Sequence, residues 1–183
     1  MPSMVAFLES PHSLKPHPVN GRVYGEAELP EEFLNSVQKL GIIEPIVVRS
    51  DNTIISGHRR WAAALKLELK TVPVRTVTFD DELDEIETLI ESNRQRVKTV
   101  SQIAREGAEL QRIEGERAAL RRRATQNNET AKAVETNLSK QGSTDEHVAE
   151  ALGVSMTQWK KLKTIFARAV SGDAEAKELM KAL

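Results

Sequence analysis

Apolar positions in the first half of the chain follow a helical period in some segments and a strand period in others. Four apolar residues at helical spacing lie between Pro30 and Gly41, which predicts a helix that starts at the proline and stops at the glycine. Two β-rich runs, at 46–48 and 53–55, are separated by turn-forming residues and predict a hairpin. An Ala- and Leu-rich helix over 59–67 and a strand over 72–77 complete a compact α+β unit.

The second half of the chain is predicted to be helical. One amphipathic helix is expected over Leu83–Ile90, and another runs from Ile103 into a basic stretch. Residues 124–143 are rich in Asn, Gln, Thr, Ser and Lys and lack a sustained apolar period, which is typical of a linker or mobile loop. Two or three further helices are predicted from Thr144 onwards.

These patterns divide the chain into five segments. The fold class is α+β, with a small N-terminal domain followed by an all-α region. The segments are an extended N-terminal stretch at 1–28, the α+β domain at 29–93, a basic helical connector at 94–123, a polar linker at 124–143 and a helical region at 144–183.

The amino-acid composition excludes several classes of protein and site. The 183 residues include no cysteine, which excludes disulfide scaffolds, thiolate nucleophiles and Cys-ligated metal sites. No run approaches the ~20 apolar residues that span a bilayer, and the first ten residues do not have the pattern of a secretion signal. We therefore expect a cytoplasmic protein with no membrane partner.

Charge is informative only when it is divided along the chain. The net charge is −1, but residues 81–93 carry six acids and no base, while residues 94–123 carry nine bases and four acids. The second stretch, which contains Arg121, Arg122 and Arg123, offers a positive field to a polyanion such as nucleic acid. A solvated helix face with acid–base pairs is the alternative.

The sequence Gly57-His58-Arg59-Arg60 joins a predicted strand to a predicted helix. Free backbone N–H groups, the helix dipole and two guanidinium groups at one helix start favour a polyphosphate ligand. Alternatively, this is an exposed helix terminus whose arginines pair with neighbouring acids. His58 is the candidate catalytic residue, as a hydrogen-bond donor, metal ligand or general acid, or it is a half-exposed cap.

Residues 144–162 fit a helix-turn-helix. Ala149 is small where two helices would cross, Gly153 makes the turn, Ser155 caps the second helix, and Trp159 packs inward. The alternative is a plain helical hairpin with polar outward residues. Side chains predicted to reach phosphates or base edges of double-stranded DNA are Ser155, Thr157, Gln158, Lys160, Lys161 and Lys163.

Three tracts carry a resemblance to the ParB family. They are Gly41-Ile42-Ile43-Glu44-Pro45 with the strand after it, Gly57-His58-Arg59-Arg60, and Asn93-Arg94-Gln95-Arg96. The order and spacing of these tracts resemble the ParB/sulfiredoxin-like N-terminal domain, and ParB proteins also carry a later helix-turn-helix. Sulfiredoxin itself is excluded, because its chemistry needs a cysteine.

The resemblance implies a pocket for a nucleoside triphosphate, typically CTP with magnesium. It would place Gly57, Arg59 and Arg60 at the phosphates, and His58, which lies between them in the sequence, is a further candidate for this site. Gly41 and Pro45 would lie near the nucleotide, and Asn93 and Arg96 would approach from the third tract.

Two positions depart from the family pattern. The family usually has Glu where His58 stands, and Glu directly before the residue aligned with Asn93, where this chain has Ser92. Glu91, one residue further back, is then the candidate carboxylate ligand for a metal. Loss of a carboxylate removes a hard oxygen ligand for magnesium, so binding with slow or absent hydrolysis is expected, or a nucleotide other than CTP.

The leading hypothesis is a ParB-like DNA-binding protein of plasmid or chromosome partition. In it, a CTP pocket controls how a homodimer engages DNA, with slow CTP hydrolysis left open. One alternative is a ParB-like metal-dependent nuclease, for which His58 is the candidate, and another is a small-molecule kinase that would use Glu44. A further alternative is a nucleotide-independent helix-turn-helix regulator.

Overall fold

The computed structural model describes residues 6–125 and 143–182 and divides the chain into two compact units, residues 1–95 and 96–183. The predicted linker at 124–143 falls almost wholly outside the described residues. The predicted boundary at 93 lies two residues from the boundary of the units.

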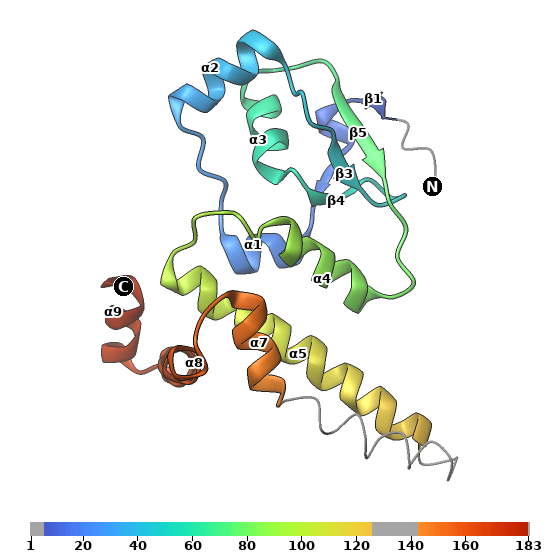
Figure 1. The fold of residues 1–183 in the computed structure, drawn as a ribbon. Coiled ribbons are helices and arrows are strands. Elements are labelled where there is room, and N and C mark those ends of the chain that lie inside the picture. Colours follow the sequence, from blue (N-terminus) through green and yellow to red (C-terminus); the bar gives the residue numbers. More distant parts are fainter. Residues whose placement is uncertain (1–5, 126–142, 183) are drawn as a thin grey trace. The chain divides into compact units, whose positions relative to one another are not determined.

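A five-stranded mixed sheet forms the centre of the first unit (Figure 1). Its spatial order is β1-β5-β3-β4-β2, with the predicted hairpin β3–β4 antiparallel and β3–β5 parallel. At the two edges of the sheet, the short strand β1 pairs antiparallel with β5, and the short strand β2 pairs parallel with β4. The strands are β1 (Phe7–Glu9), β2 (Lys15–Pro16), β3 (Ile46–Val48), β4 (Thr53–Ser56) and β5 (Val72–Thr76).

Capping residues set the ends of two helices in this unit. Gly41, with φ of 71°, ends α2 as predicted, and Asp81 caps α4 through the Asp84 N–H. The predicted helices over 59–67 and 83–90 are confirmed. The elements are the 3₁₀ turn η1 (Pro11–Ser13), α1 (Pro18–Tyr24), α2 (Glu31–Leu40), α3 (His58–Lys66) and α4 (Glu82–Ser92).

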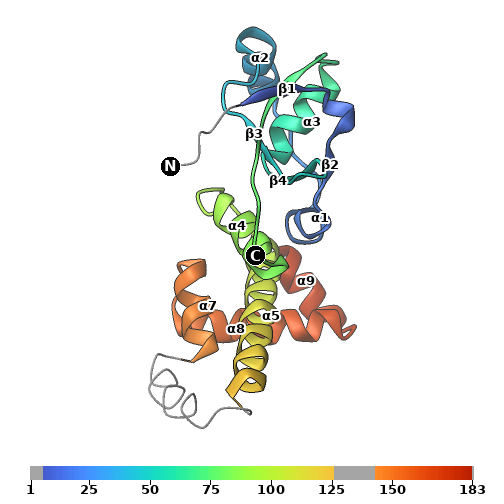
Figure 2. The ribbon, with the colours of Figure 1, turned by 90° about the vertical axis from the view of Figure 1, so that its right-hand side faces the viewer.

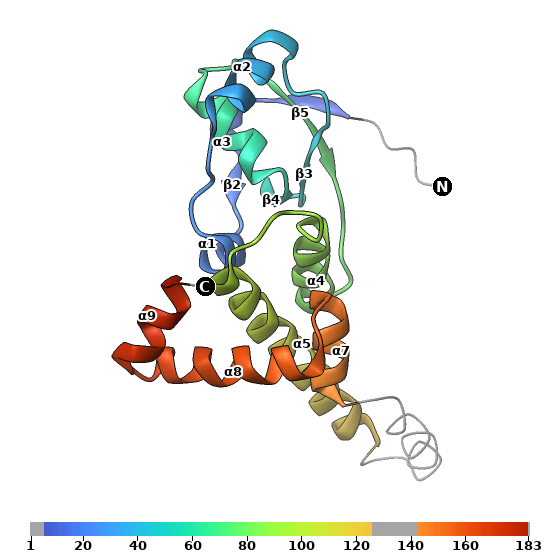
Figure 3. The same cartoon turned by 60° about the vertical axis from the view of Figure 1, so that its left-hand side comes forward.

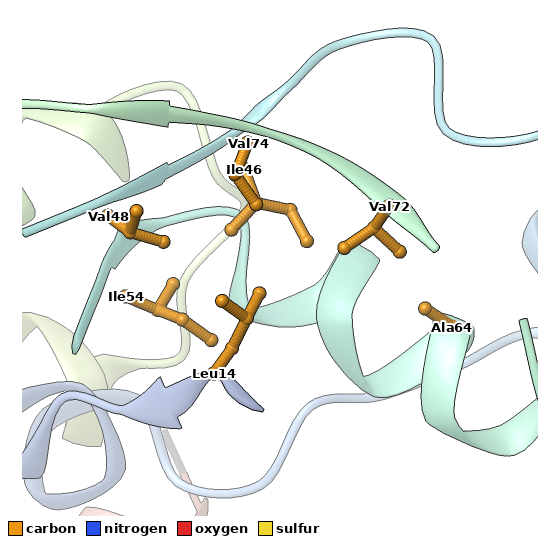
Figure 4. Packing of buried hydrophobic residues seen from close by; sticks show 7 residues of the cluster. All are labelled: Leu14, Ile46, Val48, Ile54, Ala64, Val72 and Val74. Atoms are coloured by element: carbon orange, nitrogen blue, oxygen red, sulfur yellow. The ribbon is translucent and has the colours of Figure 1, made fainter. Parts of the chain in front are cut away.

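One hydrophobic cluster of the first unit lies between the sheet and α3. Figure 4 shows its buried side chains converging from β3, β4, β5 and α3, with Leu14 closing the cluster from the segment before β2. Alternation along β3 places Ile46 and Val48 inward, both fully buried. The cluster consists of Leu14, Ile46, Val48, Ile54, Ala64, Val72 and Val74.

The prediction of an extended N-terminal segment at 1–28 is wrong for most of its described part. This segment contributes β1, β2, η1 and α1, so it completes both edges of the sheet. Its prolines indicated interruptions, but Pro18 occupies the first turn of α1, where a missing N–H costs nothing. Val23 and Tyr24 of α1 are buried, so this helix belongs to the folded domain.

Four helices form the described part of the second unit: α5 (Val100–Thr125), α7 (Thr144–Leu152), α8 (Met156–Val170) and α9 (Ala174–Ala182). Figures 2 and 3 show α8 crossing α5, with α7 beside α5. The predicted helical connector at 94–123 is helical only from Val100, and this helix, α5, is the central helix of the unit. Ala104, Leu110 and Ile113 of α5 are buried, because α7, α8 and α9 all pack against it. Within the described residues, no helix is long and apolar enough to cross a membrane.

Candidate anion site and candidate nucleic-acid interface

Gly57 forms the turn between β4 and α3, and no other residue type fits there without strain. Its φ is 100°, in the left-handed region that favours glycine. A Cβ atom would lie 3.2 Å from Nε of Arg60 and 3.3 Å from Cγ1 of Ile46. Because glycine has no side chain, the first-turn N–H groups of α3 receive no cap from Gly57, which leaves donors for an anion.

Arg60 binds the loop that precedes β3. Its NH1 group donates to the carbonyls of Glu44 (2.7 Å) and Pro45 (3.3 Å) and forms an ion pair with the Glu44 carboxylate at 2.7 Å. Burial lowers the pKa of the Arg60 guanidinium, and the Glu44 carboxylate opposes that shift. The structure therefore brings Pro45, Gly57 and Arg60 together and gives Arg60 an acidic neighbour.

Arg59 points to a different partner. Its guanidinium carbon lies 4.4 Å from the centre of the Phe33 ring, on α2, which is cation–π geometry. Arg59 is exposed, whereas Arg60 is partly buried. Arg60 thus pairs with a neighbouring acid, which was the alternative to phosphate binding in the sequence analysis. Arg59 lies on the surface at the start of α3.

His58 is buried, with 9% of its surface exposed, so it is not the half-exposed cap of the sequence alternative. Its Nε2 accepts a hydrogen bond from the His17 backbone N–H at 3.2 Å. An Nε2 that accepts carries no proton, so acid–base chemistry at that nitrogen would require the bond to break. In this structure His58 ties the start of α3 to the start of α1.

A buried polar network beside His58 was not predicted from the sequence. The His17 side chain accepts from the Val19 N–H through Nδ1, and its Nε2 donates to Oε1 of Glu85 at 3.0 Å. Glu85, only 4% exposed, also accepts from Arg49 at 3.0 Å. The signal was present in the sequence, since Glu85 is an acid four residues before Leu89 on the apolar face of α4.

The outer end of this network is an exposed ion pair. Arg49 donates to both oxygens of Asp51, at 3.0 and 2.7 Å. The hydrogen bond with Asp51 raises the pKa of Arg49, and the same bond lowers the pKa of Asp51. Asp51 also accepts from the Thr53 N–H, so the pair fixes the β3–β4 turn.

The other residues predicted for the nucleotide site have local roles in the structure. Gly41 caps α2, Asn93 caps α4 and donates from its side chain to the Leu89 carbonyl, and Arg96 is assigned to the second unit. Glu91 pairs with Arg94 at 3.0 Å. No group of three or more His, Asp or Glu suited to a metal exists among the described residues.

The helix-turn-helix of the second unit is built on two capping boxes. Ser143 and Glu146 cap α7, and Ser155 and Gln158 cap α8, each pair exchanging side-chain bonds with the backbone. Gly153, with φ of 68°, makes the turn between the helices. Ser155 and Gln158, both predicted to contact DNA, are exposed at the start of α8 but also serve as its cap.

Trp159 fixes the crossing of α8 on α5. It is 1% exposed and lies against Gly107, where a Cβ atom would come within 2.3 Å of its Cζ3. Its Nε1 donates to Oδ1 of Asp145 at 2.9 Å, and Gln111 and Lys163 donate to the same atom at 2.8 and 2.9 Å. The hydrogen bonds from Lys163 and Trp159 lower the pKa of Asp145.

The outward face of α8 carries Thr157, Lys160 and Lys161, all exposed. These residues stand at i, i+3 and i+4, so they share one side of the helix. The exposed cluster Arg121, Arg122 and Arg123 lies near the end of α5, where Arg122 also donates to the Ala118 carbonyl at 3.2 Å.

Residues 9–93 match the family model described as the ParB N-terminal domain. The chain is similar to the chromosome-partitioning protein ParB of Caulobacter vibrioides, at 38% identity over 66 residues, 33% of this chain and 21% of that protein. It is 41% identical over 87 residues to the probable chromosome-partitioning protein ParB of Coxiella burnetii, 45% of this chain and 29% of that protein. The matched segments thus span less than a third of these relatives.

A solved structure, that of a Pnob8-like ParB-N domain, superposes with a TM-score of 0.54 at 16% identity, over 88% of this chain and 69% of that one. At this identity the likeness concerns the fold alone. The first unit is therefore an α+β domain of ParB-N type, with the glycine–arginine turn at the start of α3. Residues 9–93 are thus similar to the ParB N-terminal domain.

Proposed function

We propose that the chain is a ParB-type partition protein that binds double-stranded DNA through α7 and α8 and a nucleoside triphosphate at the Gly57 turn. One observation carries the proposal: a ParB N-terminal domain is followed in the same chain by a capped helix-turn-helix with exposed lysines. The relatives' names supply the partition role, and the phosphate site rests on the uncapped N-terminus of α3 beside Arg59 and Arg60.

Nucleotide binding is expected to depend on Arg59. Isothermal titration calorimetry of the full chain with CTP and magnesium should show binding, with ATP, GTP and UTP as comparisons. Arg59→Gln should weaken binding about tenfold or more, because a charged hydrogen bond contributes roughly 1.5–3 kcal/mol. Lys66→Gln, on the exposed last turn of the same helix, is the matched control and should bind normally. No heat with any of the four nucleotides would refute the nucleotide part.

Glu44 is expected to compete with the ligand for Arg60. The Glu44 side chain is 80% exposed, so its ion pair with Arg60 is weak and a polyphosphate can replace it. Glu44→Gln should therefore bind the nucleotide about two- to fivefold more tightly, as measured by the same calorimetry. Glu68→Gln, beyond the other end of α3, should leave the affinity unchanged, whereas weaker binding in Glu44→Gln would show that the carboxylate assists the ligand.

DNA binding is expected to be electrostatic in large part. Fluorescence anisotropy of a labelled duplex should show an affinity that falls steeply with salt, because lysines on α8 would release counterions from the phosphates. A full chain that binds no duplex at 50 mM salt would refute this part and leave the nucleotide site unaffected.

A further inference from the structure

Three lysines on α8 are alike in sequence but not in their surroundings. Lys160 and Lys161 are exposed on the same face as Thr157. Lys163 stands at the flank of that face, and its ammonium group donates to Oδ1 of Asp145 at 2.9 Å. The Lys163 side chain is 41% exposed and that of Asp145 is 25% exposed, so the pair lies at the margin of the packed interface.

Asp145 is not free to follow Lys163 towards another ligand. The same Oδ1 atom accepts from Nε1 of the buried Trp159 at 2.9 Å and from Gln111 on α5 at 2.8 Å. These donors come from two helices, and each would lose its acceptor if Asp145 turned away. The carboxylate is therefore held in place, and its charge stays beside Lys163.

A lysine that leaves a fixed carboxylate for a phosphate exchanges one anion for another. It also leaves the negative Asp145 without its cation, next to a negatively charged duplex. The positive charge of Lys160 also contributes to the lowered pKa of Asp145, after the larger contributions of Lys163 and Trp159. Within the described residues, the hydrogen-bonded ion pair of Asp145 is with Lys163, so Lys160 and Lys161 give up no such bond when they contact a phosphate.

We infer that Asp145 keeps Lys163 out of the DNA-contacting set, so that Lys160 and Lys161 neutralise phosphates while Lys163 stabilises the packing of α8. This rests on the proposed DNA binding. It separates Lys163 from the other residues that the sequence analysis assigned to DNA.

The test is a salt titration of the full chain on a labelled 30-base-pair duplex of arbitrary sequence. The slope of log K against log salt concentration counts phosphate contacts, at about 0.9 for each. Lys161→Gln should reduce the magnitude of that slope by about 0.9 per bound protomer. Lys163→Gln should leave the slope unchanged and lower the melting temperature instead, because the carboxylate of Asp145 loses its cation.

Asp145→Asn supplies the converse result. The asparagine oxygen still accepts from Trp159, but the charge that holds Lys163 is gone, so the slope should increase by about 0.9 in magnitude. Adding Lys163→Gln to Asp145→Asn should return the slope to that of the unaltered chain.

Two outcomes would overturn the inference while leaving DNA binding intact: equal loss of slope in Lys161→Gln and Lys163→Gln, or no change of slope in a folded Asp145→Asn. If the unaltered chain binds the duplex with no salt dependence, the proposed DNA binding itself is wrong and the assignment of Lys163 is wrong with it. Thermal melting of each variant, followed by circular dichroism, shows that the helical unit is folded.

Discussion

Gly107→Ala is expected to lower the free energy of unfolding of the helical unit by about 3 kcal/mol, at the upper end of overpacking costs. The new methyl group would lie 2.3 Å from Cζ3 and 2.5 Å from the Cη2 position of Trp159, and 2.9 Å from Cδ1 of Leu152. The indole cannot move aside easily, because it is buried and its Nε1 is bonded to Asp145. Chemical denaturation followed by circular dichroism measures the loss.

The same helix supplies a matched control for this substitution. Gly115 is also in α5, and a Cβ atom there meets nothing within 4 Å. Gly115→Ala should therefore stabilise the unit by about 0.5–1 kcal/mol, the ordinary gain from alanine in a helix interior. If the two alanine variants have similar stabilities, α8 does not pack on α5 as the structure shows.

A second variant tests whether Trp159 is the cause. Trp159→Leu alone removes buried surface and should destabilise the unit by several kcal/mol, about as much as other large-to-small changes in cores. In the double variant, Gly107→Ala should cost much less than it does alone, because the shorter side chain leaves space for the methyl group. Additive effects in this double-mutant cycle would place the clash elsewhere.

The sequence predicted the elements whose signals are local. The helix over 31–40 is bounded by Pro30 and Gly41, and the hairpin and the helix after Gly57 follow from β-rich runs and a helical period. The family resemblance, drawn from the three tracts, is confirmed for residues 9–93. The turn residues of the helix-turn-helix are likewise local, and Gly153, Ser155 and Trp159 have the structural roles that their spacing predicts.

What the sequence could not predict depends on contacts between distant segments. The strands β1 and β2 are three and two residues long, too short for a periodic signal, and exist because β5 and β4 offer them an edge. The direction of Arg60 depends on carbonyls 15 and 16 residues earlier in the chain. The role of Gly107 depends on Trp159, which lies on another helix. The glycine alone, within an amphipathic pattern, therefore did not indicate that a larger residue would clash there.

Glu85→Ala is expected to be the most damaging single polar substitution in the first unit, with a loss of about 2–3 kcal/mol in the free energy of unfolding. The carboxylate is 5% exposed at its side chain and holds both His17 and Arg49 at 3.0 Å. Without it, the buried His17 Nε2 loses its acceptor, and the contacts that fix α4 to the start of α1 are lost. Arg49 is partly solvent-exposed, which keeps the loss below that of a fully buried pair.

Two further variants of α4 serve as comparisons for Glu85→Ala. Glu87→Ala, at an exposed position two residues further along α4, should change the stability by no more than about 0.5 kcal/mol. Glu85→Gln should fall between the two, because an amide oxygen still accepts from His17 while the amide N–H group faces the donors of Arg49. Urea unfolding of the three variants ranks them, and a Glu85→Ala protein as stable as Glu87→Ala would mean that α4 is held by its apolar side chains alone.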